Sequence, residues 1–156
     1  MPLFGKTNEH DAHDEHEKKI NKYLESMGFP GRLEQANEPG LVGVVKLTLV
    51  EHTGINITVA LDRDQFVSCS AGLGGLPTAN IAPLMRRLLV LNGLMGGPRF
   101  SITEGPPTQV ILSEVRKPDG LDLVEFRAIL DSVSAAYYQH ALPIVQEFQI
   151  LPLPVA

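Results

Sequence analysis

Apolar and polar side chains alternate through three consecutive segments, residues 41–51, 55–62 and 65–71. In the second, which reads INITVALD, every other position is a large aliphatic residue. This alternation is typical of strands that bury one face in an antiparallel sheet. The connections EHTG and DRD are short enough for hairpins, so we expect three successive antiparallel strands.

Helical spacing appears three times along the chain. The first stretch, DEHEKKINKYLESMGF, is followed by Gly28 and Pro30, which predict its end. Its apolar stripe consists of Ile20, Tyr23, Leu24 and Met27. The second covers residues 81–92, with Asn80 as the expected N-cap and Pro83 in the first turn, where a missing N–H costs nothing. Between the sheet and this helix, we expect the glycine-rich stretch AGLGGLPTAN to be a loop, and GLGG lacks the lysine and hydroxyl of a phosphate-binding loop.

The third helical stretch follows two further strand patterns, RFSIT and TQVILSEV. Asp122 and Glu125 predict a capping box at its start, and Pro143 should end or kink it. Its expected core face is formed by Leu123, Phe126, Ile129, Leu130, Val133 and Tyr137.

These elements predict an α+β fold in the order α-β-β-β-α-β-β-α. We expect an antiparallel sheet of about five strands with helices packed on one face. The pattern divides the chain into a flexible His- and acid-rich terminus (residues 1–14), a single domain (15–148) and an apolar, proline-containing tail (149–156).

Composition argues against several classes of function. The net charge of −5 argues against nucleic-acid binding, which favours a basic surface. There is no apolar run of membrane-spanning length and no hydrophobic core of a secretory signal near residue 1, so we expect a cytoplasmic protein that does not bind membranes. The single cysteine, Cys69, is expected to be a small buried side chain.

Three histidines are the strongest candidates for reactive chemistry. His10, His13 and His16 alternate with carboxylates, a combination that can bind zinc or nickel. However, they precede the first apolar position of the helix, so nothing in the sequence predicts packing that would hold a metal geometry. We therefore expect no catalytic, cofactor-binding or metal-binding residues and a non-enzymatic protein. A metal-binding or hydrolytic enzyme that uses the histidines remains the alternative.

The helix at 81–92 has more apolar surface than one core face requires. Ile81, Leu84, Met85, Leu88 and Leu91 form a stripe, Leu89 widens it, and Val90 lies opposite, between two arginines. Such a helix is either buried on several sides or shared with a partner. For a dimer, the expected interface residues are Met85, Leu88, Leu89 and Val90.

The junction LLxLNxLxGGxxF, from Leu88 to Phe100, resembles the type III secretion chaperone-like superfamily, which includes the Tir chaperone family and YbjN-like bacterial domains. The paired late strands and the last helix with Tyr137-Tyr138 support the resemblance, which covers about residues 15–148. It implies a non-enzymatic protein that forms a homodimer through the middle helix. It also implies that apolar helix and sheet surfaces hold a partner polypeptide in extended form.

The last helix offers a candidate surface for such a partner. Tyr138 and Leu142 lie one turn apart, off the core face, on a side that is otherwise polar. An aromatic and an aliphatic residue in this arrangement are suitable anchors for a partner. Two alternatives remain open: the tail from Ile144 to Val155 folds back over these residues, or the tail docks the chain into a larger assembly.

Overall fold

The structure is a computed structural model that describes residues 9–38, 40–49 and 55–153 of the 156-residue chain. Three helices and a shorter C-terminal one combine with strands in the order α-β-β-β-β-α-β-β-α. Their bounds are α1 Glu9–Ser26, β1 Glu34–Gln35, β2 Leu41–Leu49, β3 Ile55–Asp62, β4 Val67–Gly75, α2 Ile81–Leu94, β5 Arg99–Ile102, β6 Gln109–Arg116, α3 Leu123–Ala136 and, after a π-helical turn at Tyr137–Ala141, α4 Leu142–Glu147.

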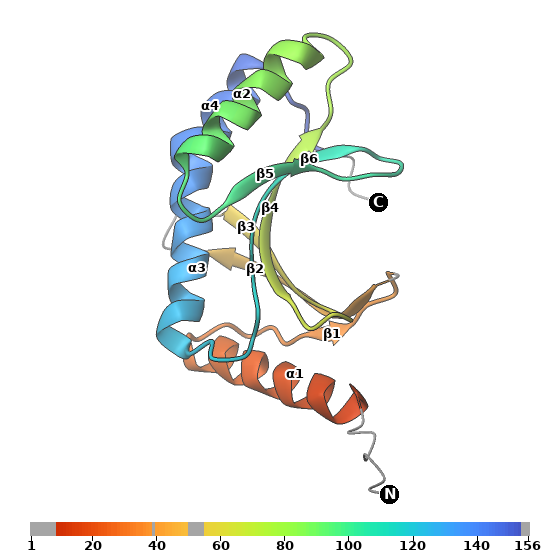
Figure 1. The fold of residues 1–156 in the computed structure, drawn as a ribbon, viewed down its shortest axis with the longest axis vertical. Coiled ribbons are helices and arrows are strands. Elements are labelled where there is room, and N and C mark those ends of the chain that lie inside the picture. Colours follow the sequence, from red (N-terminus) through yellow and green to blue (C-terminus); the bar gives the residue numbers. More distant parts are fainter. Residues whose placement is uncertain (1–8, 39, 50–54, 154–156) are drawn as a thin grey trace, which may run out of the picture.

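Within the described residues the strands form one six-stranded antiparallel sheet in the order β1-β2-β3-β4-β6-β5. The sheet is curved. Helices α2, α3 and α4 run along one side of it, and α1 lies across one end (Figure 1). The predicted α+β class, the antiparallel sheet and the placement of helices on one face are confirmed.

Strand alternation decides which side chains the helices cover. In β3 the side chains of Ile57, Val59 and Leu61 are fully buried, whereas Asn56 is exposed and Thr58 is half-buried. β4 repeats the pattern, with Val67 and Cys69 buried among the core residues. Because successive side chains point to opposite faces, the helix-facing side is aliphatic and the other side is rich in serine and threonine.

Three differences from the sequence-based expectations concern element boundaries. β4 continues through the stretch expected to be a loop, because Gly74 and Gly75 pair with β6. The short strand β1 is additional to the strands predicted from the sequence; its two residues are exposed and therefore give no alternation signal. Helix α1 begins at Glu9, so residues 9–14, expected to be irregular, belong to the helix, while residues 1–8 lie outside the described part.

The two predicted helix starts have different outcomes. At α3 the capping box is present, with the Asp122 carboxylate accepting from the Glu125 N–H at 2.8 Å and the Glu125 carboxylate accepting from the Asp122 N–H at 3.2 Å. At α2 Asn80 is the N-cap residue, as expected, but it adopts a left-handed conformation and its side chain makes no capping hydrogen bond.

Pro143 changes the helix geometry in the turn that precedes it. A proline ring clashes with the carbonyl four residues before it. In the structure the helix widens to π geometry over Tyr137–Ala141, and the Leu142 N–H bonds to the Tyr137 carbonyl, five residues back. The wider turn lets the chain continue into α4, where the proline occupies the first turn.

Candidate protein-binding surfaces

The junction between α2 and β5 is held by the side chain of Asn92. Its Nδ2 donates to the Phe100 carbonyl at 2.9 Å, and its Oδ1 accepts from the Phe100 N–H at 2.7 Å. The amide thus makes both backbone hydrogen bonds that a neighbouring strand would make. Since Phe100 is itself buried, this pair sets the position of α2 against the sheet.

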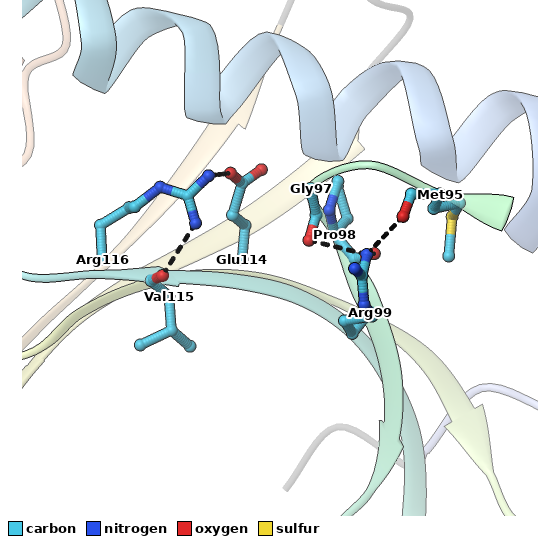
Figure 2. A network of polar contacts seen from close by, with 7 residues as sticks. All are labelled: Met95, Gly97, Pro98, Arg99, Glu114, Val115 and Arg116. Carbon is cyan, nitrogen blue, oxygen red and sulfur yellow. Dashed lines mark hydrogen bonds and ion pairs between the residues drawn. The ribbon is translucent and has the colours of Figure 1, made fainter. Parts of the chain in front are cut away.

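Arg99 closes the turn after α2. Its guanidinium donates to the carbonyls of Met95 at 2.7 Å, Pro98 at 2.9 Å and Gly97 at 3.2 Å (Figure 2). These bonds satisfy carbonyls that the end of a helix and a tight turn leave free. The glycines, asparagine and phenylalanine of the junction are therefore structural residues that orient α2.

Gly97 also makes room for a buried charge. A Cβ at this position would lie 2.9 Å from Oε2 of Glu114, whose side chain is only 5% exposed. Figure 2 shows Glu114 and Arg116 paired on one side of β6, while Val115 points to the other. Among the residues that the structure describes, Oε2 of Glu114 has no hydrogen-bond partner.

Next to this ion pair, a cavity of about 660 Å³ opens between β6, the segment after it and α3. Glu114 and Arg116 line it from the strand, and Glu125 and Ser132 from the helix. The wall of this cavity contains both carboxylate and positively charged side chains, so neither sign of charge dominates it.

The orientation of α2 leaves an apolar surface facing away from the core. Leu88 is 4% exposed and belongs to the core, and Met85 is half-buried. By contrast, Leu89 is 70% exposed, Val90 52% and Leu94 76%. We call Leu89, Val90 and Leu94 the outer face of α2. Of the residues expected at a dimer interface, Leu89 and Val90 lie on it, and Leu94 is an addition that the sequence reading missed because it lies beyond the expected end of the helix.

Tyr138 and Leu142 occupy the π-helical turn and the start of α4. Both side chains are half-buried, and Tyr138 packs against the core and edge-on to Tyr137, with 6.1 Å between ring centroids. Ile150 and Leu151 of the tail lie against the glycines of β4. Tyr138 and Leu142 are each partly accessible on the helix surface.

Of the three candidate histidines, His13 and His16 have described side chains. Nε2 of His16 lies 3.2 Å from Oδ1 of Asp119, which links α1 to the segment before α3. His13 is half-buried on the same helix, and the side chain of His10 lies outside the described part. In the described residues, no three His, Cys, Asp or Glu side chains are grouped to hold a metal ion.

Cys69 is buried in the sheet, as expected. Burial, and secondarily the negative charge of Glu114, raises the pKa of its thiol to about 12. A thiol with so high a pKa stays protonated at neutral pH and is a poor nucleophile.

No protein-family model and no curated protein sequence matches the chain. Solved structures do. YbjN of E. coli, described as a candidate transcription regulator, matches with a TM-score of 0.61 and 13% identity over 88% of this chain and 95% of that one. A chain of the ExsC–ExsE complex matches with a TM-score of 0.55 and 19% identity over 91% and 97%.

A chain of the heterodimeric ExoU–SpcU complex, from the type III secretion system of Pseudomonas aeruginosa, matches with a TM-score of 0.56 and 15% identity over 80% of this chain and 96% of that one. The chain has the fold of the type III secretion chaperones and YbjN. The resemblance seen in the sequence is thereby confirmed at the level of the fold. At these identities the likeness extends to the fold alone.

One further finding concerns membranes. In the part of the chain that the structure describes, none of the helices combines the length and the apolar character needed to cross a bilayer.

Proposed function

We propose that the protein is a non-enzymatic, chaperone-like homodimer of the cytoplasm that binds a partner polypeptide. The outer face of α2 is the observation that carries the proposal. Leu89, Val90 and Leu94 are exposed together on a helix whose position is held by Asn92 and Arg99. An exposed aliphatic group on a rigid helix is typical of a protein interface, since its burial removes apolar surface from water at little conformational cost.

The comparisons support the same proposal. Two structural neighbours are chains of complexes between two proteins, ExsC with ExsE and ExoU with SpcU. Holding a partner polypeptide requires apolar surfaces and backbone hydrogen bonds but no catalytic group. The half-buried Tyr138 and Leu142 provide a second surface of this kind, on the helices opposite the open face of the sheet.

The dimer is tested by Leu89→Glu. We expect a folded monomer in sedimentation velocity, because dimerisation would bury an unpaired carboxylate. The matched control is Val124→Glu on α3, whose side chain is 76% exposed and is not on α2. This variant should remain a dimer. A monomeric wild type, or a Leu89→Glu variant that still dimerises, would contradict the proposed interface.

The partner surface is tested by the double variant Tyr138→Ala/Leu142→Ala. Affinity capture from a native lysate with the wild-type chain should retain a partner that the double variant loses, while circular dichroism still shows a folded protein. Val124→Ala serves as the control for loss of an exposed aliphatic side chain on the same helical surface. Equal recovery of the partner by wild type and double variant would remove these two residues from the binding site.

A further inference from the structure

The glycine-rich end of β4 has an edge that the sheet itself does not complete. On one side, Gly74 and Gly75 pair with Val110 and Gln109 of β6. On the other, the β3 register runs from Leu61 opposite Val67 only to Thr58 opposite Ser70. Within the described residues, the β4 backbone beyond Ser70 therefore has no β3 partner, and its polar groups on that side are left to another segment or to water.

The chain's own tail takes this place. After α4 the chain returns toward the sheet (Figure 1), and the Gly75 N–H donates to the Leu151 carbonyl at 3.0 Å. Ile150 is 3% exposed and belongs to the core, whereas Leu151 is 73% exposed. One side chain points inward and the next outward, as in a strand added to a sheet edge.

Gly74 is required by this contact. Its φ of 134° lies in the region that favours glycine. A Cβ at Gly74 would overlap the Leu151 carbonyl oxygen and would lie 2.9 Å from Cγ2 of Ile150. The absence of a side chain thus creates a slot in which the backbone of an extended segment can lie directly against β4.

The contacts in the slot involve few features of the tail. Among the described residues they are the Leu151 carbonyl, the buried Ile150 side chain and the half-buried Leu153 side chain, which lies near Gly75; Pro152 stands between the two leucines. Because proline has no N–H, the tail cannot donate a further ladder bond at that position. Any extended segment with an aliphatic residue at the place of Ile150 can offer the same carbonyl and the same side chain.

We infer that the Gly74–Gly75 edge is a docking site for an extended, aliphatic segment of a partner polypeptide, which the chain's own tail occupies until the partner displaces it. This inference rests on the proposed function and adds a specific site to it. Recognition there is strand addition, in which backbone bonds hold the segment and a side-chain pocket selects it.

The test uses a chain that ends at Gln149 and a fluorescent peptide with the sequence of residues 148–153, FQILPL. Anisotropy should show saturable binding to the shortened chain. Binding to the full-length chain should be at least ~10-fold weaker, because a tethered tail competes at an effective concentration of about millimolar. A peptide with Asp in place of Ile150 should not bind.

Two variants of the shortened chain test whether the peptide binds in the slot at Gly74. Gly74→Ala should abolish peptide binding by filling the slot. Gly72→Ala is the matched control on the same strand, since a Cβ at Gly72 meets only Oε1 of Gln109, at 3.7 Å, and it should bind normally.

The inference is overturned if the folded shortened chain does not bind the peptide, or if it binds the Asp peptide equally well. It is also overturned if the shortened chain fails to fold, because the tail would then be an integral part of the core. A complex between shortened and full-length chains that the peptide dissociates would identify a second copy as the occupant and overturn the assignment to a foreign partner. Peptide binding combined with negative results for Leu89→Glu and the Tyr138 double variant would retain the slot and reject the proposed dimer and helix surface.

Discussion

Helices α2 and α3 are equally long, 14 residues each, but they use their apolar residues differently. In α3 the buried set comprises Phe126, Ile129, Leu130, Val133, Ser134 and Ala136. In α2 only Leu84, Leu88 and Leu91 are buried. α3 therefore uses most of its apolar surface for the core, while α2 keeps three aliphatic side chains on its outer face.

The means of attachment differ accordingly. α3 begins with a complete capping box and is held by packing along its length. α2 has no side-chain cap at its start, and polar bonds at its other end, from Asn92 and Arg99, tie it to β5. The packing of Leu84, Leu88 and Leu91 and the hydrogen bonds at one end together position α2, while its outer face stays exposed.

The largest expected difference in the free energy of unfolding is between substitutions of a core residue of α3 and of an outer residue of α2. Phe126→Ala should lower the free energy of unfolding by about 3–5 kcal/mol, through lost burial and the cavity left behind. Leu89→Ala, measured at a dilution where the chain is monomeric, should change it by less than about 0.5 kcal/mol. Urea denaturation measures both. Comparable losses would show that the outer face of α2 is part of the core.

Breaking the polar attachment of α2 should have an intermediate effect. Asn92→Ala leaves the N–H and C=O of Phe100 without their partners, which should cost about 2–3 kcal/mol in thermal or urea unfolding. Asn56→Ala is the control, since its bond to Thr48 at 2.9 Å lies on the exposed side of the sheet and should be worth less than about 0.5 kcal/mol. If the two substitutions cost the same, Asn92 does not anchor α2.

Substitutions at the two helix starts should change the free energy of unfolding by a smaller amount. Asp122→Ala removes the capping box of α3 and should cost about 1 kcal/mol of unfolding free energy. Asn80→Gly at α2 should leave stability within about 0.5 kcal/mol of wild type, because glycine accepts the left-handed conformation and no cap bond is lost. A loss at Asn80 as large as that at Asp122 would mean that α2 depends on its first residue as well.

A further effect appears only at alkaline pH and concerns Cys69, in the layer beneath both helices. The folded pKa of its thiol is raised from an ordinary 9.0 to about 12. The unfolded chain therefore loses the proton first, and the stability that depends on the protonated thiol is present below pH 9 and decreases as the pH rises toward 12. The cost of Cys69→Ala, measured by urea denaturation, should consequently shrink between pH 9 and pH 11. A cost that does not change with pH would contradict the raised pKa.

Much of the fold could be predicted from the sequence because it depends on local periodicity. The alternation in residues 55–62 predicted β3 and its buried face, and Asp122 with Glu125 predicted the start of α3. The spacing of Phe126, Ile129, Leu130 and Val133 predicted a core face that the structure confirms. These signals are local, since each depends only on side chains a few residues apart.

The candidate binding surfaces could be predicted only in part from the sequence. The apolar excess of α2 pointed to Leu89 and Val90, but the sequence could not tell that Leu88 belongs to the core while its neighbour is exposed. Helical spacing gives the relative directions of side chains along a helix, whereas the direction that faces the sheet is set by where the helix is attached. Here Asn92 and Phe100 make that attachment, across a turn whose geometry the sequence does not specify.

The sequence by itself determined the order of the elements, the strand faces, the capped start of α3 and the resemblance of the α2–β5 junction to a known superfamily. Tertiary structure alone decided the strand β1, the extension of β4 through GLGG and the docking of the tail beside Gly75. These features have no periodic signal of their own. They exist because backbone groups of one segment meet those of another far along the chain, as when Leu151 reaches the slot that the missing side chain of Gly74 leaves open.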